Sequence, residues 1–494
     1  MLYKYEALMK KRENSKPTEI TLSSPETLPF GFKIKISEFV KNQKCGFKIS
    51  GSEKESGTHV THSYKIEQQD HNVYLDLFES LSNDFGLRLP QNRRRNIARS
   101  VSNVRYREVL IENLHPEMLH GYGDPAVIRV EDEKGTLYYL LVTSNDAPQS
   151  FPILRSNDLI HWQFVGYVFP KGEKPEWASD GEFVSDYWAA EMHQFGKEFR
   201  VYFVARIKTD HELCIGMATS SSPEGPFIAA KNPILKGNVI DPHVFIDDKN
   251  IAYLFWKEDN NDIWPGLLIE LLYSHPEFIF ELFDTYEDRL TAIFIQTLWP
   301  WIKTRKSMER FFIIQVLIES VISRFLSFYN RLENFSNGQD ALVRDQIRKV
   351  LNCMKTPMFA QRLSPDGLSL IGKRSKILEN DQEWEAHLVE GMWLSENQGN
   401  YYLLYAGNDF STDQYGIGVA ISKSPLGPFV KMQKPLLKST EKWWAPGHPS
   451  IATAPDGKPY LFLHAYFPGQ TGYKKFRALL SVPLTFEPDR VLVG

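Results

Sequence analysis

Three acidic residues open similar short segments that lie far apart in the chain. Asp124 is followed by PAVIRV, Asp241 by PHVFI and Glu390 by GMWL. Carboxyl groups that face one pit can differ in pKa, so that one stays ionised while its neighbour keeps a proton at neutral pH. Such a pair can activate a water and protonate a leaving oxygen, which is what cleavage of a glycosidic bond requires. These three residues are therefore candidates for acid–base catalysis, provided that the fold brings them together.

A simpler interpretation applies to each of these residues taken alone. Asp-Pro is a common turn dipeptide, so a single Asp124 or Asp241 could serve only as a turn or cap residue. Carboxyl groups in three separate repeats favour the catalytic interpretation.

The acidic residues belong to a pattern that occurs five times. In each repeat a polar opening residue precedes a short apolar run, a turn of Gly, Asn, Asp and Lys, and an aromatic-rich strand, which together predict a β-hairpin. The opening residues are Asp124, Glu191, Asp241, Glu390 and His448. They recur at roughly 50 to 70 residues once an insertion is removed from one interval, and this period suits a propeller blade. The near-duplicate segments IGMATSSSPEGPF and IGVAISKSPLGPF also indicate repetition.

Repeats of this kind predict an all-β fold, a five-bladed β-propeller. The innermost strand of each blade runs along the central channel, so the five opening residues should meet around a single pit at its mouth. We place this domain at residues 119–494. Residues 1–118 suggest no chemistry, and we assign them to an N-terminal appendage of unknown fold.

Residues 262–358 interrupt the β pattern and predict a helical insertion. Apolar residues recur there at steps of three and four, with Glu, Arg and Gln between them. We expect the insertion to pack on itself and on the propeller rim, and docking of a protein partner or of a membrane surface is the alternative. No stretch of about 18 apolar residues occurs, so a membrane span is not expected.

Composition limits the other classes of function. With 494 residues, a net charge of −4 and 24% charged residues, the chain offers no electrostatic case for binding nucleic acid. Its 13% of aromatic residues suits an all-β protein or a carbohydrate binder. Cys45, Cys214 and Cys353 suggest neither a disulfide framework nor a Cys-based zinc site. The N-terminal residues lack an apolar core, so we expect a cytoplasmic protein or export by a route without a classical signal peptide.

From His120 to the C-terminus, apart from the helical insertion, the sequence resembles glycoside hydrolase family 43, which belongs to the five-bladed propellers. The resemblance rests on Asp124-Pro125, YWAAE (Tyr187–Glu191), DPHVF (Asp241–Phe245), Val389-Glu390-Gly391 and Pro446-Gly447-His448. LRSNDLIHW (Leu154–Trp162) and SSPEGPF add to it. The sequence departs from the family at Ala190, Met392 and Pro449, where Pro, Pro and Asn are usual.

The resemblance implies a role for each acidic residue. Asp124 would be the general base, Asp241 would tune the pKa of the acid and orient it, and Glu390 would be the general acid. An inverting enzyme holds its base and acid carboxyls about 6.5 to 9.5 Å apart, which leaves room for a water. The implied reaction is hydrolysis of α-L-arabinofuranosyl or β-D-xylosyl links in an oligosaccharide or small glycoside.

Other residues would bind the substrate or a metal. His448 matches the central-channel His of the family, which often contacts a bound calcium directly or through water; a buried His hydrogen-bonded between blades is the alternative. Candidates for substrate binding are Trp188, Glu191, Trp393, Tyr405 and His448.

Two other functions stay open at this stage. A phosphorylase or transferase on the same fold would need a basic cluster to hold phosphate, and none stands beside the opening residues. A non-catalytic propeller could instead be a scaffold that docks a partner through the helical insertion, but all three carboxylates are present.

Overall fold

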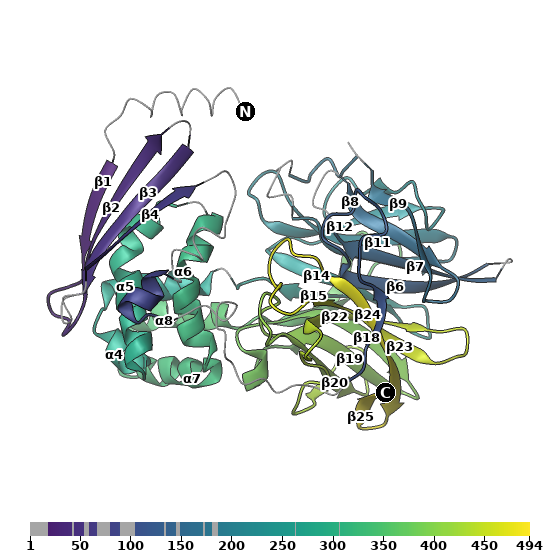
Figure 1. Cartoon of the computed structure of the whole chain (residues 1–494). Coiled ribbons are helices and arrows are strands. Elements are labelled where there is room, and N and C mark those ends of the chain that lie inside the picture. The colour runs from purple at the N-terminus through teal and green to yellow at the C-terminus, as the bar shows by residue number, and fades with distance from the viewer. Residues whose placement is uncertain are drawn as a thin grey trace. The chain divides into compact units, whose positions relative to one another are not determined.

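The chain forms two compact units. In the computed structural model the described residues are 18–41, 44–53, 59–66, 80–88, 104–132, 135–144, 149–170, 173–179, 186–261, 263–305 and 307–494. The accessory unit comprises residues 1–97 and 261–354, and the sheet unit comprises residues 98–260 and 355–494. Figure 1 shows strands in both units and the long helices in the accessory unit.

The sheet unit contains five antiparallel sheets, and four strands follow chain order in each. The first sheet contains β6 (Gly123–Asp132), β7 (Gly135–Thr143), β8 (Ser150–Ser156) and β9 (Trp162–Phe169). The second contains β10 (Trp188–Phe195), β11 (Glu198–Arg206), β12 (Leu213–Ser220) and β13 (Ile228–Ala229). The third contains β14 (Val239–Ile246), β15 (Ala252–Glu258), β16 (Met358–Leu363) and β17 (Leu370–Leu378). The fourth contains β18 (Val389–Asn397), β19 (Asn400–Gly407), β20 (Gly416–Ser422) and β21 (Val430–Lys431). The last is β22 (Trp444–Thr453), β23 (Pro459–Tyr466), β24 (Ala478–Glu487), β25 (Arg490–Val493).

The five predicted hairpins are confirmed. They are the antiparallel pairs β6–β7, β10–β11, β14–β15, β18–β19 and β22–β23. The first strands of the sheets contact one another in sequence, and β22 also contacts β6. The first strand of each sheet therefore packs between the first strands of two others.

Apolar side chains fill the space between successive sheets. Five clusters of buried residues each draw on two neighbouring sheets, and one of them joins the last sheet to the first through Leu140 and Phe462. The aromatic-rich strands supply these clusters because alternate side chains of a strand face the same side. Burial between sheets therefore fixes the strand register that aims the opening residues.

The last sheet includes a strand from before residue 119, where the sequence analysis began the sheet domain. β5 (Arg107–Leu110) pairs antiparallel with β24, so this part of the chain belongs to the sheet unit. Its sequence contains none of the hairpin signals, because its partner lies more than three hundred residues away.

The accessory unit joins two segments that the sequence analysis treated separately. β1 (Thr18–Ser23), β2 (Phe32–Lys41), β3 (Lys44–Glu53) and β4 (His59–Ile66) form an antiparallel sheet. The helices are α3 (Trp264–Ser274), α4 (Phe278–Leu282), α5 (Tyr286–Ile302), α6 (Ser307–Ile322), α7 (Phe325–Ser336) and α8 (Ala341–Met354). Phe32 of β2 packs edge-on against Phe294 of α5 at 5.0 Å, and the hydroxyls of Ser24 and Thr297 lie 2.6 Å apart. The N-terminal strands and the insertion therefore share a core.

The helices of the insertion follow from local signals. In α5 the Thr285 side chain caps the first turn by accepting a hydrogen bond from the Asp288 N–H, and acidic residues occupy that turn. In α8 the buried residues recur at helical spacing, and they are Val343, Ile347, Val350, Leu351 and Met354. Among the described residues no helix is both long and apolar enough to cross a membrane.

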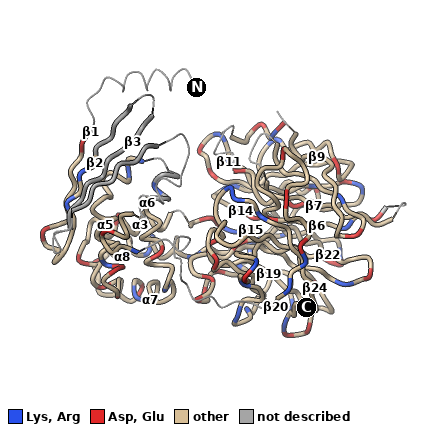
Figure 2. The backbone as a smooth tube through the Cα atoms, in the orientation of Figure 1, with Lys and Arg blue, Asp and Glu red and all other residues tan. Residues whose placement is uncertain are grey.

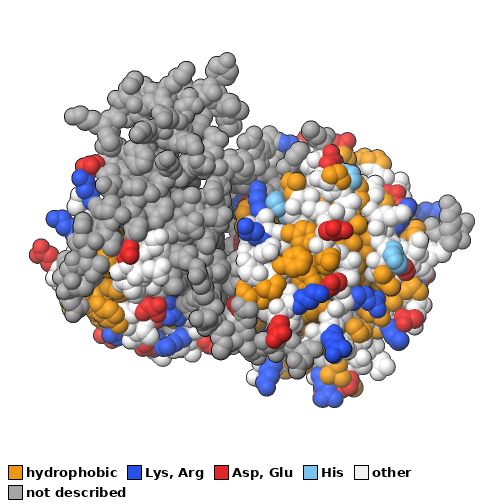
Figure 3. All heavy atoms as spheres, viewed as in Figure 1, with side chains coloured by type: hydrophobic (Ala, Val, Ile, Leu, Met, Phe, Trp, Pro, Cys, Tyr) orange, Lys and Arg blue, Asp and Glu red, His pale blue; other side chains and the backbone are white. Residues whose placement is uncertain are grey.

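Charged residues are mixed over both units. Figure 2 shows Lys and Arg interspersed with Asp and Glu along the described backbone, and Figure 3 shows apolar and charged side chains side by side on the viewed face of the sheet unit.

The insertion replaces the turn of one hairpin in the third sheet. β15 ends at Glu258, whose N–H donates to the Pro357 carbonyl across the ladder to β16. Ile240 pairs with Lys257, so the end of β15 lies beside the start of β14, near Asp241. The chain therefore leaves and re-enters the sheet unit at the edge of the candidate site.

Candidate active site

A β-bulge near the start of every first strand places the candidate residues. Each bulge inserts one extra residue opposite the neighbouring strand, and β22 contains two bulges. The bulges hold residues with positive φ, namely Asp124 (49°), Ala189 (47°), Asp241 (55°), Gly391 (53°), Ala445 (52°) and His448 (51°). A non-glycine residue in this region costs ~1 to 3 kcal/mol, and bulges of this kind re-aim side chains. Packing between the sheets maintains this strain at the candidate site.

The opening residues do not all occupy the same position in their bulges. Asp124 and Asp241 share the positive-φ position, whereas Glu390 precedes it and Glu191 follows it by two residues. The five residues are therefore not structural equivalents. The prediction identified the bulged strand starts correctly but could not locate the extra residue.

Asp124 is surrounded by cationic and imidazole groups. Its Oδ1 lies 2.9 Å from Nη1 of Arg477, 3.4 Å from Nδ1 of His448 and 3.5 Å from Nδ1 of His464. Its own N–H donates to His464 Nδ1 at 3.1 Å. Burial alone would raise the pKa of Asp124, but nearby groups, above all Arg477, outweigh it and hold that pKa well below the usual range. Asp124 is therefore a carboxylate at neutral pH.

Two glycines make room for the partners of the acidic residues. A Cβ on Gly123 would lie 1.8 Å from Cζ of Arg477, and a Cβ on Gly447 would lie 1.7 Å from a ring carbon of Tyr415. Arg477 reaches Asp124 and Tyr415 reaches Glu390 only because these positions lack a side chain.

Glu390 and Asp241 form a second, proton-binding group. The Tyr415 hydroxyl donates to Oε1 of Glu390 at 2.8 Å, and Nζ of Lys257 lies 3.5 Å from its Oε2. Asp241 Oδ2 accepts the Gly391 N–H at 2.7 Å, which ties it to the residue after Glu390. Burial raises the pKa of Glu390, and the charge of Asp241 raises it further against the effect of Lys257. Burial and the charge of Asp124 likewise raise the pKa of Asp241.

The structure thus brings the three predicted catalytic residues to one place. Asp241 interacts electrostatically with both Asp124 and Glu390. One carboxyl group is kept ionised, while the other two together retain protons near neutral pH. This arrangement can accept a proton at one point and donate a proton at another.

For Glu191 the sequence left two roles open, binding a sugar hydroxyl or only stabilising the channel, and its carboxylate is hydrogen-bonded within the protein. It is only 3% exposed, and its Oε2 lies 2.9 Å from His243 Nδ1 and 3.0 Å from His193 Nε2. The Leu394 N–H donates to His243 Nε2, so a neutral His243 has its proton on Nδ1 and donates it to Glu191. Burial lowers the pKa of His243 to about 3, which keeps the ring neutral.

The same tautomer argues against a metal held by this group. The ligand atoms of Glu191, His193 and His243 lie within 4.8 Å of one another, which is close enough for a metal. A metal ligand needs an unprotonated nitrogen, however, and His243 has one nitrogen that accepts an N–H and one that carries a proton. We interpret the group as a structural hydrogen-bond network.

Two aromatic candidates for sugar stacking are buried instead. Trp393 is 8% exposed and packs its ring 4.8 Å from that of His243. Tyr405 is fully buried, and its hydroxyl donates to Glu385 at 2.7 Å. Neither residue presents a ring face to a ligand, because both side chains point into the packing between neighbouring sheets. Trp188 is partly exposed and packs beside Val204, Leu213 and Ile240, so it stays a candidate.

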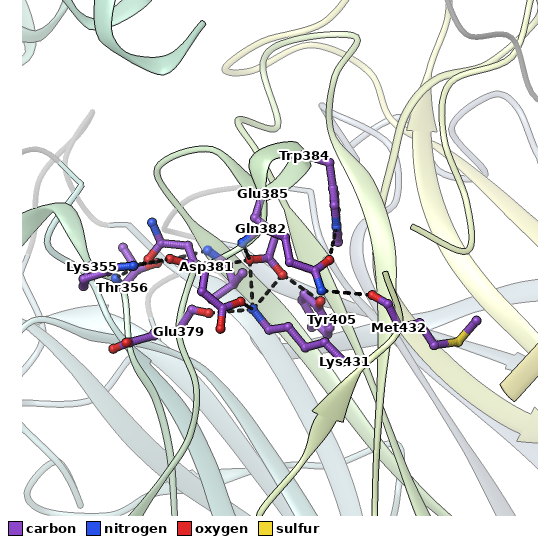
Figure 4. A network of polar contacts seen from close by, with 12 residues as sticks. Lys355, Thr356, Glu379, Asp381, Gln382, Trp384, Glu385, Tyr405, Lys431 and Met432 are labelled. Carbon is purple, nitrogen blue, oxygen red and sulfur yellow. Dashed lines mark hydrogen bonds and ion pairs between the residues drawn. The ribbon is translucent and has the colours of Figure 1, made fainter. Parts of the chain in front are cut away.

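The network around Tyr405 holds the chain just before Glu390. Glu385 is buried and accepts hydrogen bonds from Nζ of Lys431 at 2.8 Å and from the N–H groups of Asp381 and Gln382 at 2.8 and 2.9 Å (Figure 4). Beside it, the Thr356 hydroxyl accepts the Val389 N–H at 3.0 Å. These bonds fix the segment that leads from β17 into β18.

His448 lies beside Asp124, but its surroundings do not fit a directly bound calcium. Calcium takes six to eight oxygen ligands, usually carboxylates, carbonyls and waters. Oδ1 of Asp124 lies 3.4 Å from Nδ1 of His448, and Arg477 already pairs with it. The imidazole itself is a nitrogen donor, so we assign no step to calcium.

Sequence reasoning missed the residues that set the proton affinities. Arg477, His464, Tyr415 and Lys257 all lie outside the strand starts that the repeat pattern identified. Only Lys257 carried a signal, as a lysine inside the aromatic strand text YLFWKED.

Comparison with known proteins gives the class of this enzyme. The model of glycosyl hydrolases family 43 matches residues 116–272 and 336–492, which is more than half of the chain. The chain therefore belongs to glycosyl hydrolases family 43, a family of glycosidases, and the resemblance seen in the sequence is confirmed.

Individual relatives agree with this assignment. A β-xylosidase of Xylanibacter ruminicola is 23% identical over 254 residues, which cover 51% of this chain and 57% of the relative. A xylosidase/arabinosidase 43A of Humicola insolens is 37% identical over 81 residues, 16% of this chain and 23% of the relative. The chain thus matches less than two thirds of the length of either. The crystal structure of a thermostable family-43 glycoside hydrolase has a TM-score of 0.52 at 23% identity, covering 76% of this chain and 93% of that one, and it supports the fold.

Proposed function

We propose that this protein is an inverting glycoside hydrolase that cleaves α-L-arabinofuranosyl or β-D-xylosyl links in an oligosaccharide or small glycoside. The observation that carries the proposal is the opposite effect of the surroundings on Asp124 and Glu390, whose pKa values are held low and raised, respectively. The choice of sugar is supported by the printed names of the two relatives, a β-xylosidase and a xylosidase/arabinosidase.

We also propose that the sheet unit is a five-bladed propeller. Five four-stranded repeats, successive contacts between their first strands and an apolar layer between the last sheet and the first support this fold. In such a fold the starts of the first strands surround one axial pit.

In the proposed mechanism one proton is taken from the attacking water and another is given to the leaving oxygen. Asp124, ionised at neutral pH, accepts a proton from a water that attacks the anomeric carbon. Glu390 donates its proton to the glycosidic oxygen, so that the leaving group departs as an alcohol. Base and acid in an inverting enzyme act from opposite faces of the sugar, about 6.5 to 9.5 Å apart. The acid is then restored by exchange with solvent.

Asp241 positions the acid in this mechanism. Its carboxylate accepts the Gly391 N–H, which fixes the backbone on one side of Glu390. Its negative charge raises the proton affinity of Glu390. We therefore assign Asp241 to orientation and to control of the shared proton, with no covalent role.

Two variants and a comparison of leaving groups test the proposal. Asp124→Asn and Glu390→Gln should each lower turnover of aryl pentosides by roughly 10² to 10⁴, since general acid–base catalysis contributes about that much. The loss in Glu390→Gln should be smaller for a nitrophenyl leaving group than for a disaccharide, because a nitrophenolate needs less protonation. Asp456→Asn, in the turn between β22 and β23 and outside the bulges, is the control. Full activity in both catalytic variants would refute the assignment.

Neither alternative function gains support from the structure. A phosphorylase or transferase needs cations for phosphate, but Arg477 and Lys257, which lie beside the three carboxyls, are each paired with a carboxylate. Dependence of turnover on added phosphate would nevertheless identify such an enzyme. A scaffold role for the insertion stays a prediction that partner capture would test.

A further inference from the structure

A buried lysine lies against the acid. Lys257 is 0% exposed, and its Nζ lies 3.1 Å from Oδ1 of Asp259 and 3.5 Å from Oε2 of Glu390. Burying an ammonium group is costly unless it is well paired, so a lysine at this place requires carboxylates around it. Its neighbours also keep it charged, because burial alone would lower the pKa of Lys257 but Asp259, Glu390 and Asp241 together raise it.

The backbone fixes where this ammonium group lies. Lys257 sits on β15 between Ile240 of β14 and Met358 of β16, and hydrogen-bonded strands flank it on both sides. The bulge of β14 that contains Asp241 begins directly after Ile240. Lys257 is therefore held beside the acid by the same register that places Asp241.

The charged groups that face Lys257 come from three strands and the residues next to them. They are Asp259 just after β15, Asp241 of β14, Glu390 of β18 and His387 just before β18, behind which lies Asp409. Burial lowers the pKa of His387 to about 4, so it adds no second cation near neutral pH. Lys257 is thus the ammonium group that balances the carboxyls on this side of the site.

We propose that Lys257 is a positioning residue that keeps the Asp241–Glu390 pair at a single shared proton in the working enzyme. This inference rests on the proposed function. Two buried carboxyls beside the negative Asp124 would otherwise both bind protons. Asp241 would then lose the charge with which it accepts the Gly391 N–H, and Glu390 would become too weak an acid.

The pH dependence of kcat/KM for an aryl pentoside tests this inference. Removing an adjacent opposite charge typically raises a carboxyl pKa by ~1 to 3. The basic limb of this pH profile reports loss of the proton from Glu390. Lys257→Met should therefore move this limb to higher pH by ~1 to 3 units and lower kcat at pH 7. Lys257→Arg keeps the charge and should restore the limb toward its original position.

A second variant should move the basic limb in the opposite direction. Asp259 competes with Glu390 for the ammonium group and raises the pKa of Glu390 through its own charge. Asp259→Asn should therefore move the basic limb downward. Its side chain is 19% exposed, so this variant tests the proposal even if Lys257→Met fails to fold.

A control and a direct readout separate this proposal from the proposed function. Arg200→Met removes another buried cation, paired with Glu198 on β11, and should reduce stability without moving the basic limb. Infrared difference spectra count protonated carboxyls without substrate, and Lys257→Met should show one more at pH 7 than wild type. If wild type hydrolyses no pentoside, the proposed function fails while this count still tests Lys257. An unchanged count and an unmoved limb in folded Lys257→Met and Asp259→Asn would overturn the proposal.

Discussion

Replacing Arg477 by methionine should move the loss of activity on the acid side to a higher pH. The Arg477 guanidinium lies 2.9 Å from Oδ1 of Asp124, and its charge is the largest of the effects that keep this buried carboxyl ionised. Methionine retains much of the side-chain volume but none of the charge. The imidazole of His448, at 3.4 Å, remains as a weaker partner, whereas His464 uses its Nδ1 to accept the Asp124 N–H.

The expected magnitude follows from the pairing. An adjacent Arg typically lowers a carboxyl pKa by ~1 to 3, and each pKa unit corresponds to ~1.4 kcal/mol. In the variant the effect of burial is no longer outweighed by Arg477, so the pKa of Asp124 should rise by that amount. A general base must be unprotonated, so the acid limb of kcat/KM should move upward by ~1 to 3 pH units. Because the pKa of Asp124 is lowered by folding, its ionisation stabilises the protein above the unfolded pKa of about 3.9. This contribution, which wild type loses only as the pH falls through the folded pKa, should shrink in the variant at pH 7.

The assay is hydrolysis of a nitrophenyl pentoside across the pH range in which the fold is intact by circular dichroism. Gly123→Ala gives an independent route to the same result, because its new Cβ would overlap Cζ of Arg477 and push the flexible guanidinium away from Asp124. Both variants should shift the acid limb and leave the basic limb in place. If the acid limb stays where it is in both folded variants, Asp124 is not the base or Arg477 does not control it.

Other predictions test the supporting contacts. Tyr415→Phe removes the hydroxyl whose hydrogen bond stabilises the ionised form of Glu390. The basic limb of the pH profile should therefore move up by ~1 pH unit, and the free energy of unfolding should fall by ~1.5 kcal/mol or more. An unmoved limb would show that this hydrogen bond is not made in solution. Glu385→Gln removes the charge of a buried partner of Lys431. The free energy of unfolding, measured by urea melts, should fall by ~3 to 5 kcal/mol. A fall of less than ~1 kcal/mol would argue against a buried ion pair. His243→Leu leaves the Glu191 carboxylate and the Leu394 N–H short of a partner and should destabilise the protein by ~2 kcal/mol or more, with thermal melting as the measurement.

The hairpins and the acidic strand starts could be predicted because both are local. An apolar run, a turn and an aromatic strand lie within about 20 residues of one another, and Asp124, Asp241 and Glu390 stand at the beginning of such units. Their meeting in space followed from repetition alone. The position of each residue within its bulge did not, because a bulge is visible only in the pairing of two strands.

The wrong and missing assignments share a physical cause. Trp393 and Tyr405 belong to the right strands, but whether a strand residue faces a ligand or the next sheet depends on register, which the sequence does not state. Arg477 and Tyr415 reach the site from just before the third strands of their sheets, across contacts that no local pattern encodes. Likewise, the N-terminal strands and the helical insertion share a core through pairs such as Ser24 and Thr297, which are 273 residues apart.

The chemistry of this site depends on the partners of the carboxyls more than on the carboxyls themselves. Asp124 and Asp241 occupy the same bulge position with nearly the same φ, yet the pKa of one is lowered and that of the other is raised. The backbone therefore does not distinguish them. What differs is that Arg477 contacts the first, whereas the second faces other carboxyls and one lysine that it must share with them. It follows that the nearby cations set the different proton affinities of these two positions. Variants that remove the charge of Arg477 or Lys257 therefore test the mechanism more sharply than removal of any acidic residue.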